Sequence, residues 1–386
     1  MKTYFQSWLA IAILASAILP VTIMTSQPAR AAGPWYVAPG GSDGNSCLSA
    51  GSPCATINGA IGKAASGDTI YVATGTYTNS TGSEVVLIDK DTTLSGGWDP
   101  AFATQGGMST IDGQSGRRGI TVNSGLTAII ERFVIQNGSA VDGGGIYNNV
   151  GTVTLTNSTV SGNTSPFGGG GGIYNNVGTL ILDNSTVSTN TASSGQPAVG
   201  GGGGIYNSNG TVTLNNSTVS GNTSPYSGGG IFNEGILTLN NSTIRGNTAD
   251  GGGGIRNFGG TVTLQNSILA GNTAPISPDC SGTLSSAGYN LIGNTTGCTF
   301  NSTTGDLLNT NPQLFPLIGW PGFHPLLPSS PAINAGNPSG CTDNLGNPLN
   351  TDQRGVARVG RCDIGAYEYD PNNDPLRYVF LPLISR

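Results

Sequence analysis

The sequence predicts an all-β protein, a single-stranded parallel β-helix of about 8–10 coils, from three observations. First, a Gly-Gly-Gly-Ile motif recurs at intervals of 24 to 32 residues. Second, apolar and polar residues alternate with a period of two after each motif, as in a β-strand. Third, Gly and Asn separate these short stretches, and both residues tolerate the positive φ of tight turns. The motif ends at Ile146, Ile173, Ile205, Ile231 and Ile255.

Stacking of the repeats is required because one repeat is too short to bury its apolar residues alone. Each strand then pairs with its copy about 4.8 Å along the axis. Val153 and Leu155 point inward, and the motif isoleucines form one internal column. Two Asn columns are expected at turns, where stacked amides hydrogen-bond along the axis. The first comprises Asn157, Asn184, Asn216, Asn241 and Asn266, and the second comprises Asn163, Asn190, Asn222, Asn247 and Asn272.

Both ends of an open β-helix need protection. Residues 55–66 place Ile57, Ala60, Ile61 and Ala64 on one helical face, which predicts an N-terminal capping helix. After Pro275 the repeat gives way to a Pro-rich, Cys-containing segment that is expected to cover the last coil. The predicted organisation is a signal peptide (1–31), an N-terminal strand and capping helix (32–68), the β-helix (69–279), a disulfide-containing cap (280–369) and a tail (370–386).

The first 31 residues have the pattern of a secretory signal peptide. Lys2 is followed by an apolar stretch from Trp8 to Met24 and by small residues at Ala29-Arg30-Ala31. The alternative is an uncleaved membrane anchor. No later stretch of the sequence is long and apolar enough to span a bilayer. The protein is therefore expected outside the cell or on the cell surface.

Charge and cysteine usage restrict the possible partners. Removing residues 1–31 takes away Lys2 and Arg30 and leaves 12 basic and 20 acidic residues, which argues against nucleic acid and anionic membranes. An even number of cysteines in an exported chain favours disulfides, and a single histidine argues against a metal site. No cofactor is expected. Cysteines that are neighbours in the sequence are the candidate pairs, namely Cys47 with Cys54, Cys280 with Cys298, and Cys341 with Cys362.

Several motifs resemble known families. The Gly-Gly-Gly-Ile motif precedes blocks VSGN, VSTN, VSGN, IRGN and LAGN, a pattern that resembles the repeats of polymorphic outer membrane proteins with Val, Ile or Leu in place of Phe. The opening WYVAPGGSDGNSC…PCATINGAI…GDTIYVATGTYT is similar to that of bacterial right-handed parallel β-helix proteins, and SPAINAG, DQRG, Arg358 and DIGAYE resemble the choice-of-anchor Q domain. The resemblance covers most of residues 35–369. It implies a right-handed coil and a secreted or surface-attached protein, but no particular activity, because this fold hosts adhesins and polysaccharide-degrading enzymes alike.

Catalysis on polysaccharides needs clustered charges. Lyases combine acidic calcium ligands with an Arg or Lys base, and hydrolases need two nearby carboxylates. Between Ser139 and Pro275 the charged residues are few and fall in different columns, which favours structural or solvent-facing roles. They are Asp142, Asp183, Glu234, Arg245, Asp250 and Arg256.

Four other sets of residues are candidates for a catalytic or ligand-binding site, but a structural role is favoured for each. The pair Arg117-Arg118 could meet an anionic sugar, or it lies on a turn surface. The oxygen-rich stretch 40–47 (GGSDGNSC) could hold calcium, but it lacks the spaced acids of a good calcium loop. His324 is interpreted as a packed histidine. Asp352, Arg354, Arg358, Asp363 and Glu368 invite a catalytic interpretation, but their position favours a cap held by Arg–carboxylate pairs.

An aromatic row beside the isoleucine column is the candidate binding site. Alternation directs these side chains away from the isoleucines and toward solvent, where rings about 4.8 Å apart would offer a flat stacking surface for sugars. Alternatively, the rings only stack on one another and stabilise the fold. The row comprises Tyr147, Tyr174, Tyr206, Phe232 and Arg256.

We therefore predict a secreted or cell-surface protein that acts in adhesion or binding of extracellular glycans or proteins. The scarcity of ionisable groups on the coils predicts that it is not an enzyme, and no catalytic or metal-binding residue is assigned. The alternatives are an extracellular polysaccharide lyase or glycoside hydrolase, and a structural component of the cell surface.

Overall fold

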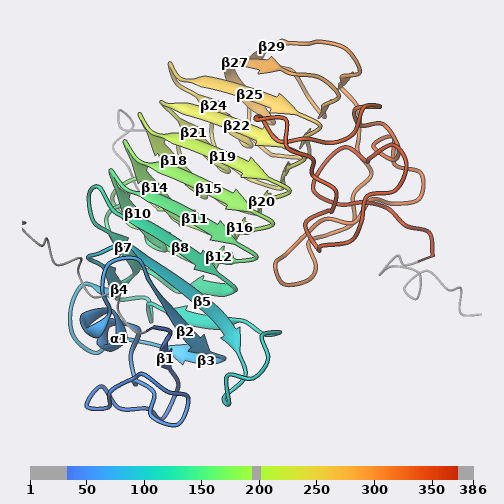
Figure 1. The fold of residues 1–386 in the computed structure, drawn as a ribbon. Coiled ribbons are helices and arrows are strands. Elements are labelled where there is room, and N and C mark those ends of the chain that lie inside the picture. Colours follow the sequence, from blue (N-terminus) through green and yellow to red (C-terminus); the bar gives the residue numbers. More distant parts are fainter. Residues whose placement is uncertain (1–32, 194–200, 373–386) are drawn as a thin grey trace, which may run out of the picture. The chain divides into compact units, whose positions relative to one another are not determined.

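The computed structural model describes residues 33–193 and 201–372, so the predicted signal peptide and most of the predicted tail lie outside the described residues. Within that part the chain winds into a parallel β-helix (Figure 1). Its strands stack into three long parallel sheets, which we call A, B and C. Successive strands of each sheet pair in parallel and in register: for example, β11 (Thr152–Thr156) pairs with β15 (Thr179–Asp183), and β15 pairs with β19 (Thr211–Asn215). The coil is right-handed, as β-strand crossovers nearly always are. The predicted fold class is confirmed.

Each regular coil contributes one strand to sheet C, then one to sheet A, then one to sheet B. Over the described residues, sheet A consists of β1 (Trp35–Val37), β2 (Asp68–Ala73), β5 (Thr92–Trp98), β8 (Thr127–Glu131), β11 (Thr152–Thr156), β15 (Thr179–Asp183), β19 (Thr211–Asn215), β22 (Ile236–Asn240), β25 (Thr261–Gln265), β27 (Cys280–Ser286) and β29 (Cys298–Asn301).

Sheets B and C complete the coil. Sheet B consists, in the same part of the chain, of β3 (Gly75–Tyr77), β6 (Ser109–Asp112), β9 (Phe133–Gln136), β12 (Thr159–Ser161), β16 (Thr186–Ser188), β20 (Thr218–Ser220), β23 (Thr243–Arg245), β26 (Ile268–Leu269), β28 (Leu291–Ile292) and β30 (Leu307–Leu308). Sheet C consists there of β4 (Glu84–Ile88), β7 (Arg118–Val122), β10 (Ile146–Asn149), β14 (Ile173–Asn176), β18 (Ile205–Ser208), β21 (Ile231–Asn233), β24 (Ile255–Asn257) and the start of β27. A short pair, β13 (Thr164–Ser165) and β17 (Thr191–Ala192), lies between sheets B and C.

The core is a set of aliphatic columns that run along the axis. The isoleucines of the motif pair in register from β10 to β24, and all five are fully buried. Val153 and Leu155 in β11, with their copies in the next coils, form two more buried columns. Each buried isoleucine contributes roughly 1.5–3 kcal/mol. The inward-pointing set predicted from the alternation is thus confirmed.

Asn side chains form continuous hydrogen-bond ladders inside the solenoid. In the column Asn163 to Asn272, each side-chain amide donates to the amide oxygen of the next Asn at 2.9–3.0 Å. This ladder was predicted. A second ladder, which was not predicted, joins Asn148, Asn175, Asn207, Asn233 and Asn257 at 2.7–2.9 Å. These ladders satisfy buried polar groups that the turns would otherwise leave unpaired.

The Asn157 column has a different role from the predicted one. Its five residues lie at the corner between sheets A and B and all have positive φ, between 45° and 50°. Among the described residues, no side-chain hydrogen bond joins one member of this column to another. The prediction of an amide ladder here is wrong, because asparagine is selected for its tolerance of the left-handed conformation. The side chains of Asn216, Asn241 and Asn266 hydrogen-bond the C-terminal segment instead.

The glycines of the motif allow the coils to approach each other closely. Gly170 has a φ of 68°, which favours glycine. Two residues later, a Cβ on Gly172 would lie 2.7 Å from the carbonyl oxygen of Gly204 in the next coil. Side chains are therefore excluded at this turn for two separate reasons, conformation and space.

The helix predicted at the N-terminal end is present. It is α1 (Ile57–Lys63), with Thr56 as its N-cap, and it packs on β1, β2 and β4 in the first coils. Ile57, Ala60 and Ile61 are buried, as the amphipathic pattern predicted. The helix thereby covers apolar side chains that have no preceding coil to stack on.

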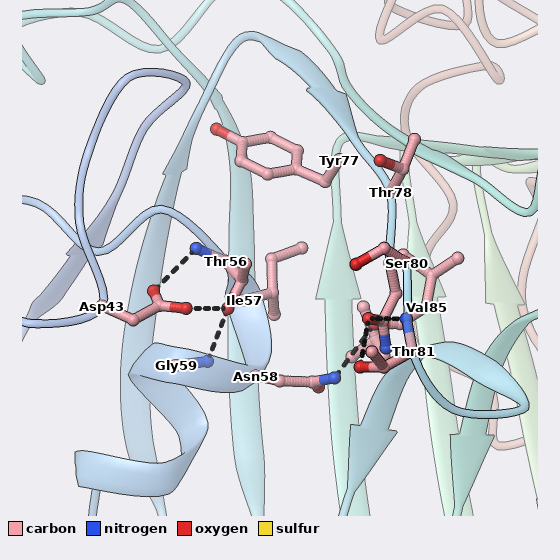
Figure 2. Close-up of a pocket in the computed structure, with 12 residues that line it drawn as sticks. Asp43, Thr56, Ile57, Asn58, Gly59, Tyr77, Thr78, Ser80, Thr81 and Val85 are labelled. Carbon is pink, nitrogen blue, oxygen red and sulfur yellow. Dashed lines mark hydrogen bonds between the residues drawn. The ribbon is translucent and has the colours of Figure 1, made fainter.

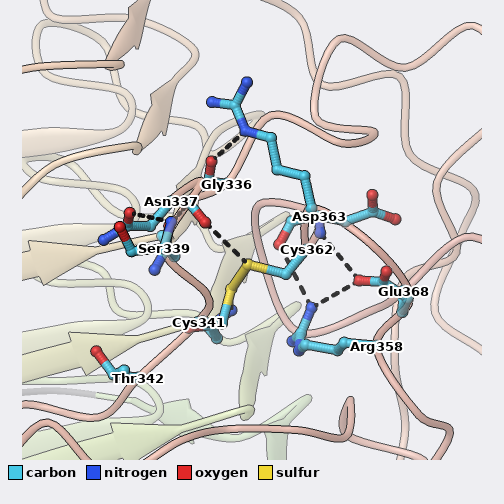
Figure 3. Close-up of a disulfide and its surroundings, with 12 residues drawn as sticks. Gly336, Asn337, Ser339, Cys341, Thr342, Arg358, Cys362, Asp363 and Glu368 are labelled. Atoms are coloured by element: carbon cyan, nitrogen blue, oxygen red, sulfur yellow. Dashed lines mark hydrogen bonds and ion pairs between the residues drawn. A yellow bond between two sulfur atoms is a disulfide. The ribbon is translucent and has the colours of Figure 1, made fainter.

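The chain beyond residue 279 begins as more solenoid. Parallel pairing continues through β27 and β29 of sheet A and through β28 and β30 of sheet B, past the residue at which we predicted the β-helix to end. The sequence lacks the Gly-Gly-Gly-Ile motif here, so the repeat was not visible. Three disulfides, at Cys47–Cys54, Cys280–Cys298 and Cys341–Cys362, join the cysteines that are sequence neighbours. The last of these lies in the irregular C-terminal segment (Figure 3).

The irregular segment that follows, residues 309–372, lies along the side of the solenoid. The hydroxyl of Thr186 in β16 donates to the carbonyl of Gly322, that of Thr218 in β20 donates to Gln353, and that of Thr243 in β23 accepts from the backbone of Ala366. We predicted a cover for the last coil, but these contacts run over the outer face of sheet B across several coils. The reason is that this face carries a column of hydroxyls that need partners once buried.

Candidate functional site

The aromatic row lies on the outer face of sheet C. Tyr147, Tyr174, Tyr206, Phe232 and Arg256 pair in register from β10 to β24. Their ring arrangement is not uniform: Tyr147 and Tyr174 are stacked with centroids 5.5 Å apart, whereas Tyr206 meets both neighbouring rings edge to face. The expected flat platform is therefore limited to the first two rings.

The exposed fractions of the side chains also separate Tyr147 and Tyr174 from the rest of the row. Tyr147 and Tyr174 are half-buried, but Tyr206 is only 7% exposed and Phe232 only 3%. Gly169, in a turn of the preceding coil, lies so close to the Tyr206 ring that a methyl group there would collide with it. The expectation that the whole row faces solvent is thus wrong for Tyr206 and Phe232, because edge-to-face packing and this turn cover them. The accessible part of the row is Tyr147 and Tyr174.

Charged and polar groups surround the accessible pair. The guanidinium of Arg118 in β7 lies 5.0 Å from the centre of the Tyr147 ring, a cation–π distance. It also donates to the carbonyl oxygens of Asp142 and Gly143 and to the Thr121 hydroxyl, at 3.0–3.2 Å. Burial lowers the pKa of Arg118, an effect that nearby acidic groups partly offset. Arg118 therefore holds the edge of the ring pair in place.

Two carboxylates flank Arg118. Glu84 in β4 accepts from the Thr121 hydroxyl at 3.3 Å, and Asp142 accepts from the backbone of Gly169 at 3.3 Å. Burial raises the pKa of Asp142 above its usual value. Glu84 and Thr121 were not singled out from the sequence, because they precede the regular repeats. Aligning the sequences of β4 and β7 with those of the motif strands would have identified both residues.

The buried end of the row is closed by a carboxylate. The Tyr206 hydroxyl donates to Glu234 at 2.7 Å, and burial, together with Glu234, raises the pKa of Tyr206. Arg256 lies 5.8 Å from the ring centre of Phe258. Glu234 is thus engaged with a ring of the row, while Phe258, which stacks on Phe232 at this end, is 57% exposed.

The remaining charged residues of the coils have local partners or lie exposed. Asp183 accepts from Asn215 at 2.7 Å, and Asp250 is exposed. Arg245 donates to the carbonyl of Phe315 at 2.8 Å. His324 is 6% exposed and hydrogen-bonds Ser220 at 2.9 Å, and burial lowers its pKa to about 4. His324 is accordingly a neutral, packed histidine that helps to attach the C-terminal segment.

The stretch 40–47 has a structural partner. Figure 2 shows the Asp43 carboxylate directed at the start of α1, where it accepts from the backbone N–H groups of Ala55 and Thr56 and from the Thr56 hydroxyl at 2.8–3.0 Å. These bonds occupy the oxygens that a calcium ion would use. Within the described part of the chain there is no group of three or more His, Cys, Asp or Glu side chains that could hold a metal ion.

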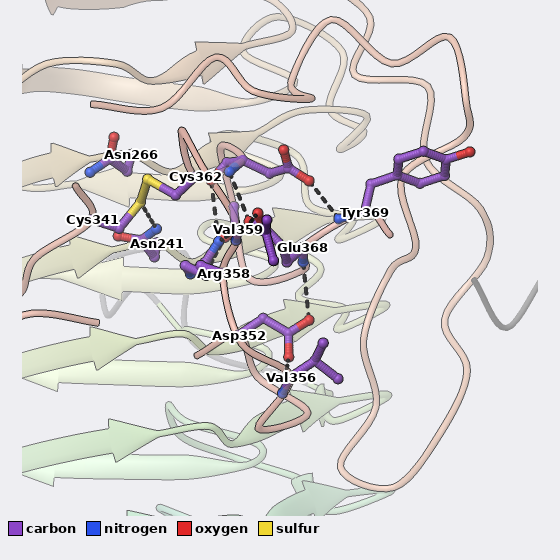
Figure 4. Close-up of polar contacts among 12 residues, drawn as sticks. Asn241, Asn266, Cys341, Asp352, Val356, Arg358, Val359, Cys362, Glu368 and Tyr369 are labelled. Atoms are coloured by element: carbon purple, nitrogen blue, oxygen red, sulfur yellow. Dashed lines mark hydrogen bonds and ion pairs between the residues drawn. A yellow bond between two sulfur atoms is a disulfide. The ribbon is translucent and has the colours of Figure 1, made fainter. Parts of the chain in front are cut away.

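The charged set of the C-terminal segment forms buried ion pairs. Arg358 contacts Glu368 at 3.1 Å with both side chains only 4% exposed, and Arg354 contacts Asp352 at 2.7 Å. Burial, followed by the charge of Glu368, raises the pKa of Asp363 to about 7. Figure 4 shows Asp352, Arg358 and Glu368 near the Cys341–Cys362 disulfide and near Asn241 and Asn266 of the solenoid. Every carboxylate of the set is engaged by backbone or guanidinium groups, as expected for a cap.

In residues 33–193 and 201–372, no helix is both long and apolar enough to cross a bilayer.

Comparison with known proteins yields little. No family model matches the sequence, and no curated protein matches it significantly. Among solved structures, the chain is similar to the crystal structure of the pectate lyase Pel9A, with 16% sequence identity and a TM-score of 0.42, over 87% of this chain and 96% of that chain. A similarity this distant transfers no site and no residue role.

One prediction is corrected by this comparison. We predicted that the protein is not an enzyme, but the matched structure is that of an enzyme. The resemblances to polymorphic outer membrane protein repeats and to the choice-of-anchor Q domain remain predictions, since no family model matches the chain.

Proposed function

We propose that this protein is an extracellular β-helix protein that binds polysaccharide on the outer face of sheet C, at Tyr147 and Tyr174. The observation that carries the proposal is the pair of half-exposed rings, stacked 5.5 Å apart and bordered by Arg118. Partly exposed aromatic rings next to hydrogen-bonding groups suit sugars, which present both C–H surfaces and hydroxyls. Three disulfides support a location outside the cell.

Binding measurements on paired variants test this proposal. Replacing both rings, Tyr147→Ala with Tyr174→Ala, is expected to lower the affinity for a bound polysaccharide by about tenfold or more, which corresponds to roughly 1.4 kcal/mol. Phe167→Ala is the matched control, because Phe167 is an aromatic residue 72% exposed outside the row. A polysaccharide array that gives the same affinities for the double variant and the wild type would rule out this site.

A polysaccharide lyase is the second candidate, and one observation favours it. Arg118 lies beside Glu84, Asp142 and the accessible rings, and burial lowers its pKa, the change that a guanidinium base needs. Such a base would remove the proton at C5 of a uronate, the C4–O glycosidic bond would break, and a C4=C5 double bond would form. Incubation with polygalacturonate and detection of unsaturated products by ultraviolet absorbance tests this. Products that appear with wild type and persist in Arg118→Met would exclude Arg118 as the base.

A further inference from the structure

A cavity lies at the corner between sheets A and B, away from the aromatic row of sheet C. Its volume is about 530 Å³, within the range of about 300–1,000 Å³ typical of ligand sites. Arg132 and Asn157 line it from the solenoid, and Trp320 and Arg354 line it from the C-terminal segment. No acidic residue is among its lining residues.

Trp320 is displayed at the tip of a short hairpin. Ile318 and Phe323 exchange backbone hydrogen bonds at 2.8–3.0 Å, and Trp320 lies in the turn between them. Its side chain is 65% exposed, and it borders a second cavity of about 270 Å³ that Thr159 also lines. A large aromatic group held exposed on a packed hairpin has the position of a binding surface.

The Thr159 hydroxyl lacks the partner that its copies have. Thr159, Thr186, Thr218 and Thr243 pair in register along sheet B. The hydroxyls of the last three hydrogen-bond the C-terminal segment at 2.6–3.1 Å. Thr159 is only 2% exposed, and its Oγ1 has no hydrogen-bond partner among the described residues. Leaving a buried hydroxyl unpaired is costly, so this coil presents an unmet hydrogen-bonding group next to Trp320.

Arg132 is a weakly paired cation at the same corner. It occupies the position of the Asn157 column and has a φ of 59°, a conformation uncommon for arginine. Its Nε is buried without a hydrogen bond, and its closest carboxylate, Glu131, lies 3.7 Å away. Arg354, in contrast, is held by Asp352 at 2.7 Å. A guanidinium that is partly buried and weakly paired favours an anionic partner.

We propose that this corner binds a carboxylate-bearing sugar unit of an acidic polysaccharide. The carboxylate pairs with Arg132, and the sugar ring packs on Trp320. The ligand class rests on the proposed function, whereas the residues are separate from those of sheet C. In later coils the C-terminal segment contacts the residues at the equivalent positions. The bound sugar unit would take the place of that segment at the corner that contains Arg132.

Titration with oligomers of galacturonic acid and with neutral galactose oligomers of the same length tests the proposal. Arg132→Asn introduces the residue that the later coils carry at this position, so its melting temperature should equal or exceed that of the wild type. Its affinity for the acidic oligomer is expected to fall about tenfold or more, with no change for the neutral one. Trp320→Ala should weaken binding of both oligomers, and Phe167→Ala should weaken neither.

The outcomes separate this proposal from the sheet C site. Unchanged binding of the acidic oligomer by Arg132→Asn and by Trp320→Ala would overturn it, as would a wild type that does not bind that oligomer. Loss of binding in Arg132→Asn, with full binding in the Tyr147→Ala, Tyr174→Ala variant, supports this corner and refutes sheet C. Loss only in the tyrosine variant supports sheet C and refutes this corner.

Discussion

The regular coils and the C-terminal segment bury polar groups by opposite means. Between Ser139 and Pro275 the interior is neutral: aliphatic columns and Asn ladders repeat from coil to coil. In residues 309–372 nothing repeats, and the packing depends on buried ion pairs such as Arg358–Glu368 and on the Cys341–Cys362 disulfide. In the repeats, each Asn side-chain amide of a ladder hydrogen-bonds the equivalent Asn of the next coil. In an irregular segment, each buried polar group needs a different partner of its own.

The difference also bears on where binding sites occur. A repeated surface presents the same side chains in every coil, and the row on sheet C shows that such side chains pack on each other. Two buried atoms without a hydrogen-bond partner, Nε of Arg132 and Oγ1 of Thr159, lie in the coils beside Trp320 of the irregular segment. The boundary between repeated and irregular structure is thus a second place where we propose a binding site, besides the row on sheet C.

The largest expected effect comes from placing a charge in a repeated column. Ile205→Asp buries an unpaired carboxylate among isoleucines that have no exposed surface, so we expect a loss on the order of 5 kcal/mol in the free energy of unfolding. Thr213→Asp is the control, because Thr213 is on the outward-facing set of β19 and is only partly buried. Denaturant unfolding that gives similar stabilities for these two variants would contradict the internal column.

A smaller loss is expected from breaking an ion pair of the irregular segment. Arg358→Met leaves Glu368 buried without its partner, which typically costs about 3–5 kcal/mol. Arg361→Met is the control, since Arg361 is exposed and donates only to backbone carbonyls. Limited proteolysis should release the segment in Arg358→Met while the coils stay protected. Equal protection of the segment in both variants would show that the pair does not hold it.

Periodicity explains why so much of the solenoid could be predicted. The positions of Ile146 and Val153 repeat in every coil, so one rule places an entire column. The same rule could have found the second ladder, because Asn148 and its copies stand two residues after each motif isoleucine and so point inward.

Contacts without a period could not be predicted. Gln353 hydrogen-bonds Thr186 across 167 residues, and no sequence pattern links the two. The burial of Tyr206 depends on how closely the turn at Gly169 approaches it, a distance that alternation does not determine. The candidate site shrank to Tyr147 and Tyr174 for this reason, and the corner at Arg132 was missed because its partners lie in the irregular segment.

A pH effect should come from Asp363 in the C-terminal segment. The pKa of Asp363 is about 7 in the folded protein and near 3.9 in an unfolded chain, so the folded state binds the proton more tightly. Its contribution to stability is full below about pH 4 and is lost as the pH rises to about 7, by at most about 1.4 kcal/mol per pH unit. Asp363→Asn should flatten the dependence of unfolding free energy on pH in this window. A slope equal to that of the wild type would show that another group is responsible.

The smallest effects separate the two Asn columns of the coils. Asn190→Ala interrupts the ladder between Asn163 and Asn222 and leaves buried groups unpaired, at a cost of about 1–3 kcal/mol. Asn157→Gly keeps the positive φ and removes no ladder bond, so its unfolding free energy should stay within about 0.5 kcal/mol of the wild type. Equilibrium unfolding of both variants measures the difference. If Asn157→Gly lowered the unfolding free energy as much as Asn190→Ala, the Asn157 side chain would make a stabilising bond. The equivalent position of Arg132 could then no longer be interpreted as a turn whose side chain is available to a ligand.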